Sequence, residues 1–335
     1  MPHTCQQAEL QEIKLKNMTQ NLEITLDKIL LNHNSERKII NEPGDSDWGQ
    51  LIIPGKHENP NKTSQGLKIV IMASYRTGFL LIKTLIEFEK KHSDKLNIVG
   101  LITDDPLSPH ARISMKRRIW RLFDDDKKLT IEDTIIETAL SFGVPCFTGA
   151  VKTNYARKLI HHWNPDAIEV CVFGQIIDEP IIQYPKYGIY NFHPADLLHQ
   201  LGAGPQPFQD LINRNASTSR FTIHQLTQQL DQGEVVGQSP LINVQDKNGK
   251  TPNNILILED KMIEPMDTMA IVLTHKLIEL YMNNTKNVIN KIDFNNYFTN
   301  EQKEFLMKPI VETEPINGLP STSTSALKLT EGIEN

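Results

Sequence analysis

The chain has 335 residues, of which 39% are hydrophobic and 23% are charged, a balance typical of a globular protein with one large domain or two modest ones. Its net charge of −6 and pI near 6.0 argue against a surface built mainly to hold nucleic acid or anionic membrane. Three scattered cysteines exclude a disulfide framework and a CxxC metal site. Without a signal-like N-terminus or a run of roughly 20 apolar residues, the sequence predicts a cytoplasmic protein with no membrane segment.

Residues 1–66 predict an N-terminal extension whose function the sequence does not reveal. Residues 6–31 have a helical pattern, and they are followed by NEPGDSDWGQLIIPGKHENPNKTSQG, whose Pro, Gly and Asn residues break any regular period. We therefore expect a small appendage joined by a flexible link that ends near Gly66.

The sequence pattern changes at Leu67, where apolar runs begin to alternate with amphipathic segments. The apolar runs KIVIMAS, NIVGLITD and AIEVCVFGQ read as buried strands, and the amphipathic segments between them read as helices. Strands that are apolar throughout and alternate with helices indicate a mostly parallel sheet covered on both faces. The sequence therefore predicts an α/β, Rossmann-like fold.

The C-terminal part carries a long apolar helix at 265–282, and residues 286–335 predict a short helix around TNEQKEFLM and a tail. The tail from about Val311 is rich in Ser, Thr, Pro and Gly, so it cannot bury enough apolar surface to offset the entropy of ordering. We expect a short helical region followed by a disordered tail.

Two common functions are disfavoured by missing motifs. The turn after the first strand reads SYRTGF, with one glycine in place of the GxGxxG of dinucleotide-binding domains, and no Walker A loop occurs.

His161 and His162 are adjacent on a predicted helix and point about 100 degrees apart, without a further ligand at metal-binding spacing. No metal site is expected.

The stretch NFHPADLLHQLGAGPQP, residues 191–207, places an amide and an imidazole two residues apart at the end of a short strand. Residues i and i+2 of a strand share a face, so Asn191 and His193 project together at the carboxyl edge of the sheet, where ligands bind in open α/β folds. Asp231 lies in a loop between a strand over about 219–226 and a strand from Val235. Singly, each could be a cap, a core histidine or a turn residue.

Together, these three side chains suit acyl transfer to an amine or to water without a covalent enzyme intermediate. Asn191 could donate a hydrogen bond to the oxyanion of a tetrahedral intermediate. His193 could move protons near neutral pH, and Asp231 could orient and balance the charge of the imidazole or move the proton itself.

The same residues resemble the formyltransferases that use 10-formyltetrahydrofolate. That family carries Asn-x-His-Pro, a Leu-Leu-Pro loop, a glycine, a threonine and Asp-x-Gly. The corresponding residues here are Asn191, His193, Pro194, Leu197, Leu198, Gly202 or Gly204, Thr222, Asp231 and Gly233. Residues 204–207, GPQP, are similar to the GPNP of sugar-amine formyltransferases, and residues 170–182 are similar to the strand and loop that line the folate pocket.

The resemblance implies a formyltransferase catalytic domain over residues 67–285. It also implies a catalytic trio of Asn191, His193 and Asp231 that passes a formyl group from N10 of 10-formyltetrahydrofolate to an amine. It also implies that the donor lies against the segment after the third strand and the loop before Asp231. The donor contacts expected on this basis are Val172, Phe173, Gly174, Gln175, Ile176 and Gln229.

The acceptor is less well indicated, because the loop after His193 departs from the family pattern. It has about two extra residues, with Asp196 as one candidate, and His199 stands in place of the family proline. Methionyl-tRNA formyltransferases carry a further C-terminal barrel, for which little chain remains here. We therefore expect a small anionic or sugar-like amine and not a tRNA, with Arg76, His199 and Gln206 as substrate contacts.

Other interpretations stay open at the level of sequence. The trio could direct water at the formyl group, as in formyltetrahydrofolate hydrolases, or the protein could be a catalytically silent folate-binding protein. The basic segment 112–121 could hold a phosphate, a nucleotide-sugar or an acidic carrier protein, or form a solvated helix face. The sequence does not decide between a monomer and a homodimer.

Overall fold

The computed structural model describes residues 38–41, 49–55, 62–104, 120–285, 288–289 and 291–311. The predicted helix in 6–31, nearly all of the basic segment 112–121 and the tail after Val311 lie outside the described residues. Within the described part of the chain, no helix is long and apolar enough to cross a bilayer.

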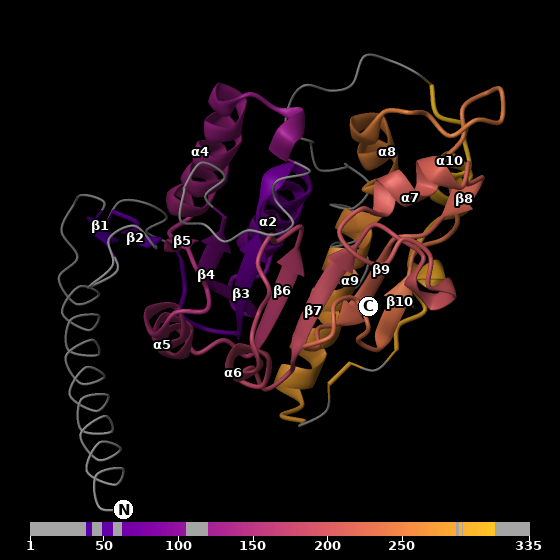
Figure 1. The fold of residues 1–335 in the computed structure, drawn as a ribbon. Helices are drawn as coiled ribbons and strands as arrows, with labels where there is room; N and C mark the ends of the chain where they lie inside the picture. Colours follow the sequence, from indigo (N-terminus) through magenta and orange to yellow (C-terminus); the bar gives the residue numbers. More distant parts are fainter. Residues whose placement is uncertain are drawn as a thin grey trace, which may run out of the picture.

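The described chain forms a nine-stranded, mostly parallel sheet with the order β1-β2-β5-β4-β3-β6-β7-β9-β10 (Figure 1). The five central strands, from β5 to β7 in this order, are parallel, and the strands at both edges are antiparallel. This arrangement confirms the predicted Rossmann-like α/β fold. The strands are β1 (Lys38–Asn41), β2 (Gly49–Ile53), β3 (Leu67–Ala73), β4 (Leu96–Thr103), β5 (Cys146–Gly149), β6 (Ala167–Cys171), β7 (Ile189–His193), β9 (Thr222–Gln225) and β10 (Val235–Gln238).

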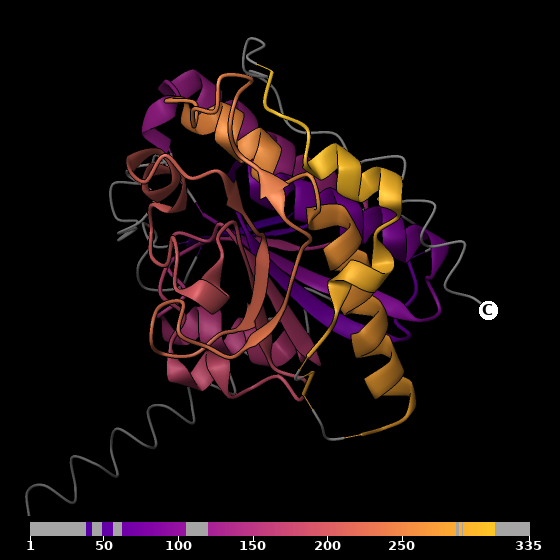
Figure 2. The same ribbon diagram turned by 90° about the vertical axis from the view of Figure 1, so that its right-hand side faces the viewer.

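Helices cover both faces of the sheet. On one face α2 packs against α4 and α9, and on the other α5 packs against α6; Figure 2 shows α9 running beside α2. The central strands are mainly apolar because both of their faces are buried, and the buried Glu169 of β6 is an exception. The helices are α2 (Tyr75–Lys91), α4 (Asp125–Ser141), α5 (Asn154–Trp163), α6 (Glu179–Ile182), α7 (Pro207–Asn213), α8 (Ile255–Met262), α9 (Met266–Met282) and α10 (Asn300–Leu306).

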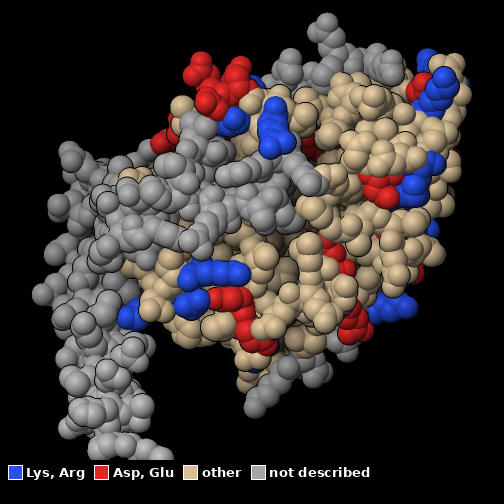
Figure 3. Space-filling view, viewed as in Figure 1, with Lys and Arg blue, Asp and Glu red and all other residues tan. Residues whose placement is uncertain are grey.

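Short elements complete the described chain. A two-stranded sheet pairs β8 (Thr218–Ser219) with β11 (Ile242–Asn243), and single 3-10 turns occur at η1 (Trp120–Leu122), η2 (Leu197–His199) and η3 (Phe294–Tyr297). Asp124 caps α4 by accepting a hydrogen bond from the Lys127 amide, and two further acidic residues follow in the first turn. Figure 3 shows these acidic side chains gathered over the start of α4, where they complement the helix dipole.

The N-terminal extension contributes to the sheet, which its sequence did not predict. The β1–β2 hairpin adds two strands, and β2 pairs antiparallel with β5 so that Leu51 lies opposite Phe147. Leu51 and Ile53 of β2 are buried. The described end of the extension is held to α2, because Lys62 Nζ lies 2.6 Å from Glu89 Oε1.

The strand order reverses at the boundary between β3 and β6. From β3 the chain proceeds through β4 to β5 on one side, and it then returns to build β6 and β7 on the other side. The loops that leave two such strands diverge and open a crevice at their carboxyl ends. Here those ends are Ser74, after β3, and Val172, after β6.

Candidate active site

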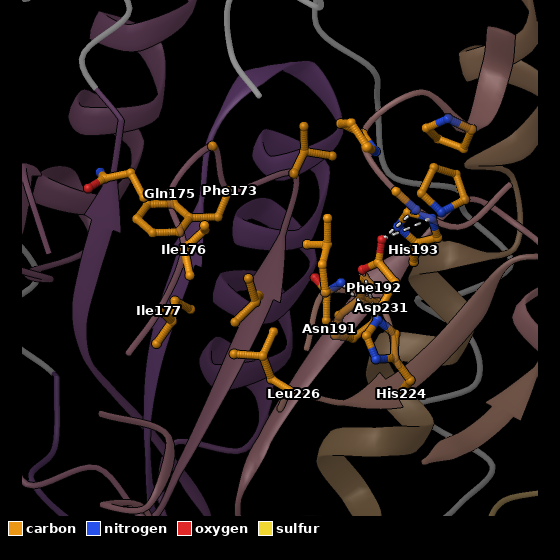
Figure 4. A pocket seen from close by; sticks show the side chains of 18 of the residues that line it. Phe173, Gln175, Ile176, Ile177, Asn191, Phe192, His193, His224, Leu226 and Asp231 are labelled. Atoms are coloured by element: carbon orange, nitrogen blue, oxygen red, sulfur yellow. Dashed lines mark hydrogen bonds and ion pairs between the residues drawn. The ribbon is translucent and has the colours of Figure 1, made fainter. Parts of the chain in front are cut away.

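A pocket opens at this switch point and extends along the carboxyl ends of β6 and β7 (Figure 4). Asn191, His193 and Asp231 all line it, so the structure brings the predicted trio together. The remaining lining residues are Ser74, Tyr75, Trp120, Val170, Val172, Phe173, Gly174, Gln175, Ile176, Ile177, Phe192, Pro194, Gly204, Pro205, Pro207, Phe208, His224, Leu226, Thr227, Gln228, Gln229 and Leu230.

Asn191 is oriented by a histidine on the neighbouring strand. The antiparallel register of β7 and β9 places Asn191 opposite His224, and the Asn191 Nδ2 to His224 Nε2 distance is 2.9 Å. His224 Nδ1 lies 3.0 Å from the Gln225 carbonyl oxygen, which can only accept, so Nδ1 donates and Nε2 is left to accept. The amide therefore donates to His224 with one N–H and keeps the second.

The imidazole of His224 is neutral at physiological pH. Burial lowers its pKa to about 4, with a further lowering from the nearby His193 that outweighs the opposite effect of Asp231. A neutral ring suits an acceptor for the Asn191 amide. Sequence reasoning missed His224, although it alternates with Thr222, which the family pattern does include.

Two glycines of the loop after β7 hold the other two members of the trio. His193 Nε2 donates to the Gly202 carbonyl at 3.0 Å, and the Gly204 amide donates to Asp231 Oδ2 at 2.8 Å. Both glycines have positive φ, 70° at Gly202 and 95° at Gly204, which other residues adopt at a cost. The glycine-rich exit of the loop thus presents backbone groups to the site.

The ionisable atoms of the site lie within Coulombic reach of one another. His193 Nε2 is 4.0 Å from Asp231 Oδ2, and His224 Nε2 is 3.6 Å from Asp231 Oδ1. The loop carrying Asp231 can approach β9 this closely because Gly233 has no side chain, since a Cβ there would lie 1.6 Å from the Gln225 carbonyl oxygen. The conformation of the Asp231 loop therefore depends on Gly233.

Backbone strain is concentrated around this pocket. Tyr75, Val172 and Asp231 have φ values of 66°, 46° and 53°, and all three residues line the pocket. Left-handed backbone is unfavourable for non-glycine residues and most unusual for a β-branched one. Strain of this kind is kept where packing over-determines it, which is frequent at functional sites.

The segment after β6, which was expected to hold the donor, forms one side of the pocket. All six predicted donor contacts line the pocket. The conformation of the segment after β6 is fixed by Asp104, directly after β4. Asp104 accepts from the Gly174 amide at 2.8 Å, from Gln175 Nε2 at 3.0 Å and from Ser74 Oγ at 2.9 Å. The Gln175 side chain is thus engaged within the protein, and Asp104 is a supporting residue that sequence reasoning missed.

The residues expected to contact the acceptor are not part of the described pocket lining. Arg76 is 1% exposed, and its guanidinium pairs with Glu259 at 3.2 Å and Asp260 at 2.7 Å. Burial raises the pKa of Glu259 to about 7, against the lowering effect of Arg76. The structure therefore corrects the expectation for Arg76, which balances buried carboxylates and does not face the pocket.

His199 and Gln206 also lie outside the lining. The His199 side chain is 69% exposed and its Nδ1 lies 2.8 Å from Asp196 Oδ2, while Gln206 occupies the N-cap position of α7. Asp196, which marks the longer loop, also accepts from Gln238 Nε2 at 2.9 Å and so fixes the loop to β10. Among the described residues, no three His, Cys, Asp or Glu side chains cluster as metal ligands would.

Relatives of the chain are found among folate-dependent enzymes. The methionyl-tRNA formyltransferase of Thermotoga neapolitana is 27% identical over 183 residues, which cover 54% of this chain and 51% of the relative. That of Ehrlichia chaffeensis is 34% identical over 98 residues, which cover 29% of this chain and 32% of the relative. The chain spans about half the length, or less, of these curated relatives.

Solved structures give weaker likenesses. Glycinamide ribonucleotide transformylase 1 from Symbiobacterium toebii has a TM-score of 0.46 at 12% identity, covering 69% of this chain and 96% of that one. WlaRD, a sugar 3N-formyl transferase, has a TM-score of 0.39 at 15% identity, covering 70% of this chain and 72% of that one.

The family model for formyl transferases matches residues 67–264, which is more than half of the chain. The match begins with β3 and includes the β6 loop, the end of β7 and the loop that carries Asp231. The chain therefore belongs to the formyl transferase family.

Proposed function

We propose that this protein transfers the formyl group of 10-formyltetrahydrofolate to an amine of a small molecule. The observation that carries the proposal is the convergence of Asn191, His193 and Asp231 on one wall of a pocket whose neighbouring wall is the segment 172–177. An amide donor, an imidazole and a carboxylate in one crevice are the groups that acyl transfer without a covalent intermediate requires.

In this proposal the folate lies along the loop after β6 and the segment 226–230. The acceptor nitrogen attacks the formyl carbon, and the negative charge that develops on the formyl oxygen is stabilised by the second N–H of Asn191. The first N–H is already committed to His224 at 2.9 Å, so the donor is oriented before the substrate arrives. Preorganised donors of this kind stabilise an oxyanion without reorganisation.

His193 and Asp231 would manage the protons. The attacking amine must lose a proton, and N10 of the folate must gain one when the bond between N10 and the formyl carbon breaks. Asp231, 4.0 Å from His193 Nε2, would stabilise an imidazolium formed on the way. The net reaction gives a formamide and tetrahydrofolate, with no metal in any step.

The acceptor is proposed to be a small amine and not a tRNA. Among the described lining residues there is no Lys or Arg, and the guanidinium expected to receive an anion is paired inside the protein. A phosphate-rich substrate would need basic contacts near the reacting amine. The described residues therefore support an acceptor that is held without phosphate contacts in the pocket itself.

The test is tetrahydrofolate release from 10-formyltetrahydrofolate by the purified full chain, followed by absorbance and mass spectrometry. Three arms contain buffer, a small-molecule extract of the source cells, and methionyl-tRNA. Release that requires the extract, with a metabolite heavier by one formyl group, is the expected result. Release in buffer would indicate a hydrolase, formylation of the tRNA would contradict the small acceptor, and folate binding without release would indicate a silent binding protein.

A further inference from the structure

Part of the pocket lining lies outside the trio and outside the two segments proposed to hold the folate. That part is formed by the start of α2, by η1 and by the start of α7, through Tyr75, Trp120, Pro207 and Phe208. These elements come from three distant parts of the chain. If the donor lies along the segments 172–177 and 226–230, these residues are the lining left for the acceptor.

The chemistry of this part is aromatic. The Tyr75 ring meets Trp120 edge-to-face with centroids 5.1 Å apart, and Phe123 packs on it at 5.7 Å. Tyr75 keeps a φ of 66° at the start of α2, so this packing holds the ring in place against a backbone penalty. Rigid aromatic walls of this kind favour apolar and aromatic ligand groups.

The polar side chains at the start of α2 are engaged within the protein. Ser74 Oγ donates to Asp104, Thr77 Oγ1 donates to Glu259, and Arg76 pairs with Glu259 and Asp260. The polar groups of the first turn are thus directed to carboxylates inside the protein. Among the described lining residues, Asp231 is the one carboxylate and no Lys or Arg is present.

We infer that the acceptor is selected by an uncharged aromatic or other apolar group close to its amine, held between Tyr75, Trp120 and Phe208, and not by a phosphate. This inference rests on the proposed function, because it assigns the acceptor side of the same pocket. It differs from the sugar-like or anionic acceptor that the sequence suggested. The aromatic lining residues on which this selection would depend are Tyr75, Trp120 and Phe208.

The test compares three amines that differ in the group beside a similar primary amine: glycinamide, tyrosinamide and O-phosphotyrosinamide. With saturating 10-formyltetrahydrofolate, we expect kcat/KM for tyrosinamide to exceed that for both other amines by at least about tenfold, since burying an aromatic ring contributes that much or more. Formamide formation is read by mass spectrometry and tetrahydrofolate release by absorbance.

Variants separate recognition from folding. Phe208→Ala should lower kcat/KM for tyrosinamide by about tenfold while leaving that for glycinamide and the donor KM nearly unchanged. Phe208→Leu keeps most of the packing volume and should give a smaller loss, which guards against a folding defect. The matched control is Phe305→Ala, because Phe305 is a 51% exposed aromatic residue on α10 outside the pocket lining.

Three results would overturn the inference. They are O-phosphotyrosinamide as the best of the three acceptors, an equal loss with every amine in the Phe208 variants, or no formylation of any probe while the extract still supports transfer. In all three the proposed function stands. No tetrahydrofolate release under any condition would instead refute the proposed function, and this inference with it.

Discussion

Replacing the Asp231 carboxylate by an amide isolates its charge. In the Asp231→Asn variant, the side-chain oxygen can still accept from the Gly204 amide, now 2.8 Å away, so the loop should keep its conformation. The charge lies 4.0 Å from His193 Nε2. At an effective dielectric constant of about 20, two unit charges at that distance interact by about 4 kcal/mol, and this corresponds to about three decades in rate.

We therefore expect kcat of Asp231→Asn to fall about 10³-fold while donor affinity changes by no more than a few fold. Steady-state tetrahydrofolate release gives kcat, and fluorescence titration with the folate gives its Kd. The control is Asp210→Asn, which removes a carboxylate on α7 that pairs with Arg214 at 2.7 Å and lies outside the pocket lining. A kcat within about threefold of the wild-type value for Asp231→Asn would refute the assigned role of the charge.

Three further substitutions test the structure. Gly204→Ala should lower the Tm by roughly 2–8 °C, because alanine at a φ of 95° costs about 1–2 kcal/mol or more. The Tm is measured by calorimetry, and an unchanged value would contradict this prediction. His224→Phe should lower kcat about tenfold at constant donor KM, because Asn191 loses its acceptor; unaltered kinetics would count against that orientation. Burial raises the pKa of Glu169 to about 8 from 4.5, so wild-type stability should fall as pH rises through that window. Between these two pKa values, the free energy of unfolding of Glu169→Gln should rise relative to that of the wild type by up to about 1.4 kcal/mol per pH unit. Urea unfolding measures this difference, and a difference that does not change with pH would contradict the prediction.

The central strands could be predicted from the sequence because their burial is visible in it. The strands β3, β4 and β6 are mainly apolar, and each is flanked by a segment with helical periodicity. The short strand predicted to end around Asn191 and His193 corresponds to β7, Ile189–His193. A parallel strand covered on both faces leaves a continuous apolar run that few other structures produce.

The edge of the sheet could not be predicted in this way. The β1 and β2 segments, KIIN and GQLII, are short and lie in a region rich in Pro, Gly and Asn, and β5, which pairs with β2, is the equally short CFTG. The pairing of β2 with β5 joins residues nearly a hundred positions apart. Helix α8 was missed for a related reason, since ILILEDKM is a short apolar run without a clear period.

In the site, too, some residues could be predicted from the local sequence and others could not. Asn191 and His193 follow from the two-residue period of a strand, which is a local property. His224 reaches Asn191 only through the register between β7 and β9, and Arg76 is turned inward by Glu259, which lies 183 residues further along the chain. Partners of this kind are set by the tertiary fold and leave little trace in the local sequence.

The β1–β2 hairpin implies that the unit that folds is larger than the unit that the family match recognises. That match begins at residue 67 and ends at residue 264, whereas β2 covers the edge of β5 and α9 packs on α2 from beyond residue 264. A fragment trimmed to the match would expose the backbone groups of β5 as a free sheet edge, a template for aggregation. Expression and crystallisation fragments should therefore begin before Lys38 and extend past Met282.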